Sequence, residues 1–259
     1  MATSSEENDR MPQHISRQFD RELEGIRESV LAMGKLVRRQ LAAAVEAFSL
    51  GNAEQALLVI DNEGKANTYE ISLDKACIQL LVRRQPAASD LRMVMVIIKV
   101  VTDLERIGDE ATRIATFTRR LVKRQEAKSY YREIVSLGSL VGDMVEDALD
   151  AFSRMDSNKA VIVADQEPES DRRYEALLEQ LSEHMRQEPA SVDSLVDALW
   201  IIRSLERVGD HARNICEYVI YQAEGKDVRH ISMEQMKKRV GDPRAAPDWA
   251  TGEPATRRD

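Results

Sequence analysis

The chain has 259 residues and carries 37 basic against 45 acidic side chains, a net charge of −8. Apolar residues make up 43% of it, which is enough to bury a core and excludes a wholly disordered protein. The net acidity argues against nucleic acid as the principal partner. Aromatic residues amount to only 5%, so a sheet-rich fold is disfavoured.

The sequence also predicts a cytoplasmic location. No apolar run approaches the roughly 18 residues that a membrane span requires. The first ten residues, MATSSEENDR, contain no apolar core of a secretory signal. Cys77 and Cys216 lack the spacing of a metal site and fit a reducing compartment.

Residues 1–13 are polar and are expected to form a flexible tail. After them, apolar residues recur at steps of three and four up to Gly51 and Asn52, which predicts one helix of about 30 residues. Its apolar stripe consists of Phe19, Leu23, Ile26, Val30, Met33, Val37, Leu41, Ala44 and Phe48.

A second helix is predicted to run from there to Gln85 and Pro86. It contains Gly64, Asn67 and Asp74, which an ordinary core would avoid. Its expected apolar seam consists of Leu57, Ile60, Ile71, Ile78 and Leu81.

A third helix follows Pro86, which can open a helix because its missing N–H costs little there. Its seam begins apolar and turns acidic halfway along, which distinguishes it from an ordinary core helix. In chain order the seam consists of Leu91, Val94, Ile98, Val101, Glu105, Gly108, Thr112 and Ala115.

The pattern of the first half then recurs in the second half. The run AFS at 47–49 returns at 151–153, and LERIGD at 104–109 returns as LERVGD at 205–210. Such a repeat predicts an all-α fold, a tandem duplication of an antiparallel three-helix bundle with six long helices. We expect the bundles at 14–126 and 127–232, and a largely disordered tail at 233–259, rich in Pro and Gly from Asp242 onward. The sequence does not decide whether the bundles lie side by side or end to end.

The repeated motif places two carboxylates four residues apart on the buried face of a helix. These pairs are Glu105 with Asp109, and Glu206 with Asp210. Burial of such a pair costs several kcal/mol unless a cation, hydrogen-bond donors or protonation compensates. A positive partner is therefore expected at each pair.

The second helix of each half offers further oxygen ligands at a similar depth. They are Glu167 and Asp171 in the second half, and Glu63 and Asn67 in the first half. Oxygen-rich clusters of this kind suit a divalent or ferric metal ion, with iron, zinc, magnesium and manganese as candidates. The alternative is a buried ion-pair network that involves Arg113, Arg213 and nearby lysines, and the sequence leaves both readings open.

Other motifs point away from catalysis. The chain has no phosphate-binding Gly-rich loop, no Glu-x-x-His and no identifiable nucleophile–histidine arrangement, so we expect no enzyme. His211 is expected to make a surface or interhelix contact. The basic clusters Arg83-Arg84 and Arg119 to Arg124 are either solvated helix faces or docking sites for an acidic partner or a membrane surface.

Three segments resemble the PhoU family of bacterial phosphate-response regulators. They are HISRQFDRELEGIRESVLAMG near the start, RQPAASDLRMVMVIIKVVTDLERIGDEATRIA in the first half, and RSLERVGDHARNICEYVIY in the second. With the duplication, the resemblance covers about residues 14–235. It implies two similar three-helix bundles in a cytoplasmic, often dimeric protein that is not an enzyme.

The resemblance also implies a function and its partners. Members of the family negatively regulate the phosphate regulon and limit phosphate uptake, and they connect the phosphate ABC transporter with a sensor histidine kinase. The ATPase subunit of the transporter and the kinase are therefore the expected partners, with peripheral membrane association through them. In some relatives E/D-x-x-x-D motifs hold metal ions, which here implies the pairs of the repeated motif and Glu167 with Asp171. Asn67 departs from the acidic pattern, and the first bundle's metal site is correspondingly incomplete.

Overall fold

The computed structural model describes residues 10–84, 86, 88–124 and 130–241. These residues form nine α-helices and one short 3₁₀ helix, with no β-strand among them. The all-α expectation is confirmed. The elements are α1 (Arg10–Leu50), α2 (Ala53–Asp61), α3 (Gly64–Arg84), α4 (Ala88–Arg124), α5 (Tyr131–Arg154), α6 (Ser157–Ala164), α7 (Glu167–Gln187), η1 (Pro189–Ser191), α8 (Val192–Glu224) and α9 (Met233–Gly241).

The second helix of each half is interrupted, so the expectation of one continuous helix there is wrong. α2 ends at Asp61 with Asn62 as its C-cap and α3 begins at Gly64, and in the second half α6 and α7 are separated by Asp165 and Gln166. The side chain of Asn52 caps the start of α2, because its Oδ1 accepts hydrogen bonds from the backbone N–H groups of Glu54 and Gln55. Six long helices remain, namely α1, α3, α4, α5, α7 and α8, each of 21 residues or more.

The buried face of α3 is not the one expected from the sequence. Ile71 and Ile78, expected in the core, are 56% and 58% exposed. The buried residues of α3 are instead Ala66, Leu73, Cys77 and Leu80. The seam proposed from the sequence was wrong by one position already in α2, where Ala56 and Val59 are buried and Leu57 is 39% exposed. The buried residues of α3 continue the spacing of Ala56 and Val59 across the break.

The apolar stripe of α1 is confirmed, since every residue of it is buried except the half-buried Leu23. The apolar part of the α4 seam is confirmed at Val94 and Val101, whereas Leu91 near the helix start is 43% exposed. α1 and α4 therefore form the core of the first half, and α2 and α3 flank them.

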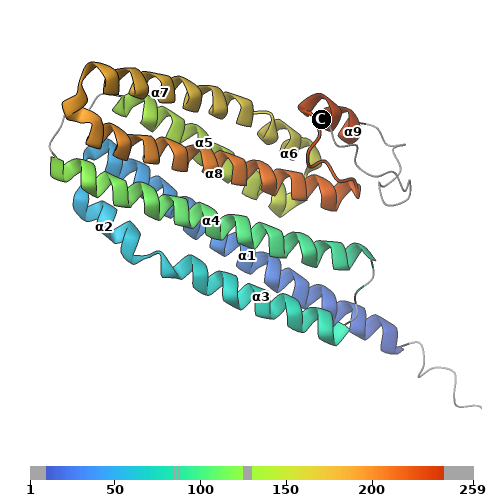
Figure 1. Ribbon diagram of the computed structural model, residues 1–259. Coiled ribbons are helices and arrows are strands. Elements are labelled where there is room, and N and C mark those ends of the chain that lie inside the picture. The colour runs from blue at the N-terminus through green and yellow to red at the C-terminus, as the bar shows by residue number, and fades with distance from the viewer. Residues whose placement is uncertain (1–9, 85, 87, 125–129, 242–259) are drawn as a thin grey trace, which may run out of the picture.

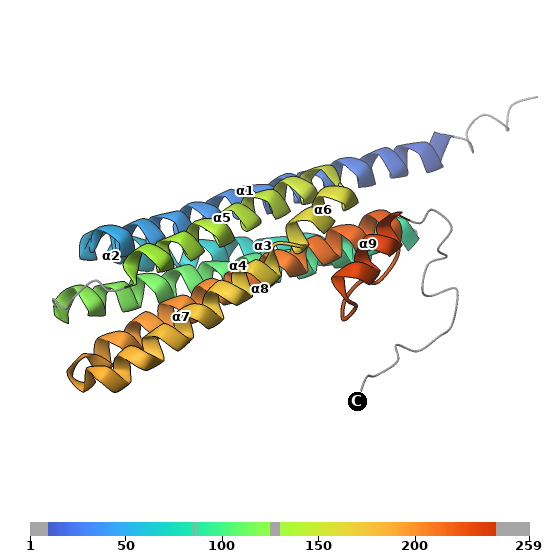
Figure 2. The ribbon, with the colours of Figure 1, turned by 90° about the horizontal axis from the view of Figure 1, so that it is seen from above.

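The two halves lie side by side, a question that the sequence left open. The most extensive contact between any two described helices joins α4 to α8, and α1 packs against α5 in the same way. The long helices run along nearly one direction (Figure 1), and the view from above shows α1 beside α5 (Figure 2). One core therefore runs through both halves.

Two glycines permit the close approach of α1 and α5. A Cβ atom at Gly138 would lie 2.9 Å from Cγ1 of Val45, and one at Gly34 would overlap the side chain of Leu149. The 104-residue offset of the duplication relates Gly34 to Gly138 and Val45 to Leu149. The two contacts are therefore equivalent. The helices α1 and α5 thus meet about a pseudo-twofold axis.

The contact between α4 and α8 contains buried charges. The carboxylate of Asp103 on α4 lies 2.7 Å from Nδ1 of His211 and accepts a hydrogen bond from Asn214. Glu110, which is almost fully buried, pairs with Arg113 at 3.2 Å and with Arg207 of α8 at 3.0 Å. The expected interhelix role of His211 is therefore observed, and the buried Glu110 is paired with an arginine on each of the two helices.

The ends of the chain differ from expectation. α1 already begins at Arg10, inside the expected N-terminal tail, and residues 1–9 lie outside the described residues. Residues 233–241, assigned to a disordered tail, form α9, whose Met236 is fully buried and which packs on α6. The proline-rich residues 242–259 lie outside the described residues. No helix in the described part of the chain is both long and apolar enough to cross a membrane.

The glycine contacts give a matched test of this packing. Gly138→Ala should lower the free energy of unfolding by about 1–2 kcal/mol, because the new methyl group meets the branched Val45 side chain. Gly142→Ala should raise it by about 0.5–1 kcal/mol, because nothing lies within 4 Å and alanine favours helix. Urea unfolding of both variants measures the difference, and equal effects would contradict the close packing of α1 on α5.

Candidate metal centre

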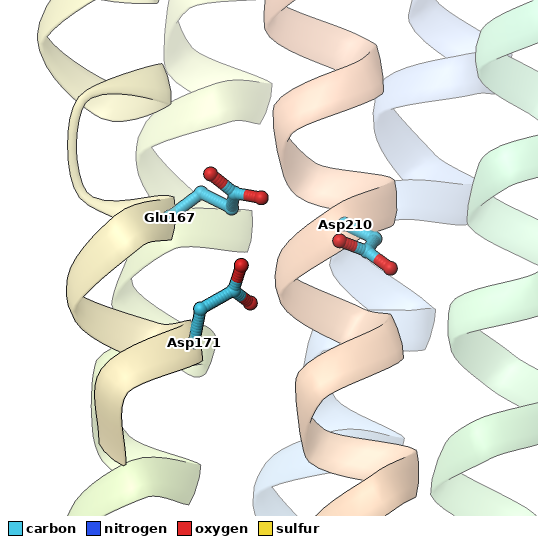
Figure 3. A group of neighbouring side chains, drawn as sticks. All are labelled: Glu167, Asp171 and Asp210. Carbon is cyan, nitrogen blue, oxygen red and sulfur yellow. The ribbon is translucent and has the colours of Figure 1, made fainter. Parts of the chain in front are cut away.

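Three carboxylates converge in the second half, at the start of α7 and the middle of α8. Glu167 and Asp171 lie one helical turn apart on α7, and both extend toward α8, which carries Asp210 (Figure 3). One ligand atom from each of the three lies within 4.8 Å of the others. This convergence of Glu167, Asp171 and Asp210 was predicted from the sequence.

Gly209 allows α7 to lie this close to α8. A Cβ atom at this position would lie 3.1 Å from Oγ of Ser170, a residue between the two acids of α7. In the first half a Cβ atom at Gly108 would lie 3.3 Å from Ala66 of α3. The glycine of each repeated motif therefore brings the acid-bearing helices together, at a helix cost of about 1 kcal/mol.

The carboxyl groups of the second half are held in an environment that disfavours their charge. Burial raises the pKa of Asp210, and the nearby Asp171 raises it further. Burial also raises the pKa of Glu206, with Asp210 adding to the effect. The pKa of Glu167 is raised by burial although Arg213 opposes the shift. A cation placed among these groups would remove the repulsion that they share.

Arginines compensate only part of this charge. Arg213 donates to Glu167 at 2.7 Å and to Glu217 at 3.2 Å, and Arg203 pairs with Glu206 at 2.5 Å. Within the described part of the chain, Asp171 and Asp210 take part in no ion pair. A buried ion-pair network, the alternative to a metal ion, therefore accounts for Glu167, Glu206 and Glu217. It leaves Asp171 and Asp210 without an ion-pair partner in the part of the chain that the structure describes.

Two buried oxygen atoms at this cluster also have no partner among the described residues. They are Oε2 of Glu206 and Oγ of Ser170. Unpaired buried acceptors of this kind are costly, and a bound cation with its water ligands would satisfy them. The residues present thus fit a metal ion.

In the first half the expected acids Glu105 and Asp109 are joined by an acid that was not expected. Glu105 and Asp109 of α4 lie beside Glu70 of α3, around an open hollow of about 330 Å³. Burial raises the pKa of Glu105, and Asp109 and Glu70 raise it further. Burial and Asp74 likewise raise the pKa of Glu70. The acidic motif of α4 therefore faces Glu70, and Asp74 adds negative charge near Glu70.

Glu63 and Asn67, the residues expected to complete the first site, do not line the hollow of Glu70 and Glu105. Glu63 is exposed and lines a separate hollow together with Asp109. Asn67 is half-buried, and its Oδ1 has no partner among the described residues. Sequence reasoning missed Glu70 and Asp74, although their spacing of four residues is the same signal as in the other acidic pairs.

The two halves also differ in how their arginines are used. Arg113, a candidate partner of Asp109, pairs with Glu110 instead.

The second-half cluster is the only one in the described part of the chain in which three ligand groups come within 4.8 Å. Its donors are all carboxylate oxygens, which favours hard cations such as magnesium, manganese or iron over zinc, which takes nitrogen and sulfur ligands more often.

Comparison with known proteins places these features in a family. The family model described as "PhoU domain" matches residues 30–118 and 134–219, one match in each half. The chain is 44% identical over 232 residues to a Pseudomonas aeruginosa protein named "Phosphate-specific transport system accessory protein PhoU homolog", and the alignment covers 90% of this chain and 96% of that protein. It is 39% identical over 225 residues to the Escherichia coli protein "Phosphate-specific transport system accessory protein PhoU", covering 87% and 93% of the two chains.

Solved structures agree with the sequence comparison. The crystal structure of PhoU from Pseudomonas aeruginosa superposes with a TM-score of 0.79 at 43% identity, and covers 80% of this chain and 100% of its own. The Streptococcus pneumoniae phosphate transport system regulatory protein PhoU gives a TM-score of 0.75 at 31% identity, covering 81% and 99%. The resemblance inferred from the sequence is confirmed, and this chain belongs to the PhoU family.

Proposed function

We propose that this protein negatively regulates phosphate transport and the phosphate regulon, as an adaptor between the phosphate ABC transporter and a sensor histidine kinase. The observation that carries the proposal is family membership over both halves of the chain. The relatives are named accessory or regulatory proteins of phosphate transport.

The expected partners are the ATPase subunit of the transporter and the phosphate-sensing kinase, both reached in the cytoplasm. A regulator of this kind acts through surfaces and needs no catalytic step. Association with the membrane would then occur through these partners, and a homodimer would double the number of docking surfaces.

Deletion of the gene tests the regulatory role. In phosphate-rich medium, a reporter driven by a phosphate-starvation promoter should rise several-fold in the deletion strain, because the kinase is no longer restrained. Expression of the full chain from a plasmid should restore repression. Unchanged reporter activity in the deletion strain would refute the proposal.

We also propose that the second-half cluster binds a divalent or ferric cation as part of the regulator. Glu167, Asp171 and Asp210 would ligate the ion, and Glu206 would supply a fourth carboxylate. A store or a metal-dependent enzyme built on the same acids is not favoured, because the relatives are accessory proteins. The ion would hold α7 against α8 by neutralising carboxylates on both helices.

Neutralising two of these acids should remove the ion. Glu206→Gln with Asp210→Asn should lower bound metal at least tenfold, measured by equilibrium dialysis against Mn²⁺ and by elemental analysis after purification without chelator. The matched control is Glu175→Gln with Glu179→Gln, which removes an exposed acidic pair at the same spacing on α7. Equal metal content in all three proteins would exclude a metal site at this cluster.

The raised pKa values predict a pH dependence of stability in chelated protein. Since burial raises the pKa of Glu206 and Asp210, these groups bind protons more tightly in the folded than in the unfolded state. Their stabilising contribution is therefore present at low pH, and it is lost as the pH rises from the ordinary carboxyl value of about 4 toward neutrality.

Calorimetry in chelator checks this sign. The Glu206→Gln, Asp210→Asn protein should gain in melting temperature relative to wild type as the pH is raised from about 4 to 7. Acids elsewhere titrate equally in both proteins, so the difference isolates the cluster. A difference that shrinks with rising pH would show that these carboxylates stabilise the fold when ionised.

A further inference from the structure

We propose that the hollow beside Phe117 and Trp200, at the C-terminal end of α4, is the docking surface for an acidic segment of a protein partner. The inference rests on the proposed adaptor function and specifies which surface and which partner chemistry it uses. It concerns a region one to four helical turns beyond the acidic motif of α4.

The surface has two aromatic side chains at its centre. The ring of Trp200 on α8 stacks on that of Phe117 on α4, with centroids 5.9 Å apart and planes within 4° of parallel, and Trp200 remains 44% exposed. Beside them lies a hollow of about 550 Å³, whose lining also includes Glu63 and Thr116. Exposed tryptophan with neighbouring arginine is the composition of interface hot spots.

The duplication shows that the packing of α4 on α8 does not require an aromatic residue here. The offset of 101 residues relates Trp200 to Lys99 and Phe117 to Tyr218. At that equivalent place Nζ of Lys99 lies 5.3 Å from the centre of the Tyr218 ring. A half-buried lysine thus packs in the same helix pair at one end, so the exposed indole at the other end needs a different explanation.

The equivalent place is covered by the segment that follows α8. Arg229 of this segment lowers the pKa of Asp227 by donating hydrogen bonds to its carboxylate, and the positive charge of Lys99 adds a smaller effect. Arg229 also interacts electrostatically with Tyr218. The chain thus places one carboxylate, that of Asp227, near Lys99 in this copy of the site, whereas Trp200 in the other copy stays 44% exposed.

Basic residues at the outer end of the surface complement such a segment. After Glu110, α4 carries no further acid, and its last two turns contain Arg119, Arg120, Lys123 and Arg124. Arg120 and Arg124 face Asp197 at 3.8 and 3.5 Å, and Arg124 also reaches Asp193.

Arg119 and Lys123 form no ion pair within the described part of the chain. Basic residues are common in the last turn of a helix because they face its negative end. That effect does not account for an exposed aromatic pair next to them.

The geometry gives the segment a direction. An apolar side chain of the partner would lie on the Phe117–Trp200 stack, and its carboxylates would extend toward Arg119 and Lys123. The acids Glu63 and Asp109 also line the hollow and would repel the carboxylates of the segment, which keeps them on the side of Arg119 and Lys123. Since Glu63 lies between α2 and α3 and Trp200 lies on α8, the docked segment would contact both halves.

The first experiment uses Trp200 as its own reporter. Trp249→Phe removes the chain's only other tryptophan, so emission reports on Trp200 alone. Titration with a random Glu–Tyr copolymer should quench this emission and shift it to the blue, and the affinity should fall at high salt. Vesicles of phosphatidylcholine with 30% phosphatidylglycerol should leave the emission unchanged. A response to vesicles but not to copolymer, or to neither, overturns the proposal, the first outcome in favour of an anionic membrane surface.

Two charge reversals locate the binding site in the same assay. Lys123→Glu in the last turn of α4 should weaken copolymer binding at least tenfold. Arg83→Glu, an equally exposed basic residue near the end of α3, should change it less than twofold. Equal effects of the two reversals would mean that the copolymer binds by net charge alone and would overturn the proposed site.

A second experiment uses the purified ATPase subunit of the phosphate transporter and the cytoplasmic part of the kinase. At least one should bind wild type, and Trp200→Ala and Lys123→Glu should each weaken that binding at least tenfold while Arg83→Glu does not. If the wild type binds and these variants bind equally well, the docking surface is wrong and the adaptor function stands. If the wild type binds neither protein, the adaptor function fails, while the copolymer titration still decides the chemistry of the surface.

Discussion

The antiparallel contact between α4 and α8 is the interaction on which the rest of this structure depends. It joins the two halves into one core, and it fixes the depth at which the acidic motifs of both helices lie. Its buried charges are paired across the contact, Asp103 with His211 and Glu110 with Arg207. Removal of His211 would leave the buried carboxylate of Asp103 with the amide of Asn214, and removal of Arg207 would leave Glu110 with Arg113 alone, so both contacts specify the register of α4 on α8.

The acidic clusters use this fixed register. α4 and α8 each hold a glycine at the point where a neighbouring helix comes close, and the adjacent carboxylates then meet acids from that neighbour. The two clusters are not equal. In the second half three ligand groups are compact and partly supported by arginine, whereas in the first half Glu70 and Glu105 border an open hollow. The duplicated halves have therefore diverged at the site that their shared motif marks.

Much of the fold followed from the sequence because helical periodicity is a local signal. The stripe of α1, the repeat and the acids of the second half needed only spacing along one helix. The break between α2 and α3 did not, because it depends on capping and a turn at Asn62. Glu70 lies on the same face of α3 as Asn67 at helical spacing, and it was missed because spacing along one helix does not show which residue of that face borders Glu105 on another helix. The contact of α4 with α8 could not be predicted for a different reason. The packing of two helices that are distant in sequence produces no periodic pattern of residues that would indicate it.

The difference between Glu110 and His211, which occupy equivalent positions in the repeat, has a consequence for assembly. In a symmetric pair of first halves, Glu110 of the other copy would take the place of His211 opposite Asp103. Two carboxylates would then be buried together. In a pair of second halves, His211 would lose its carboxylate partner and meet Ser204. Neither half can therefore replace the other as a self-associating unit, and covalent linkage keeps the complementary halves at a ratio of one to one.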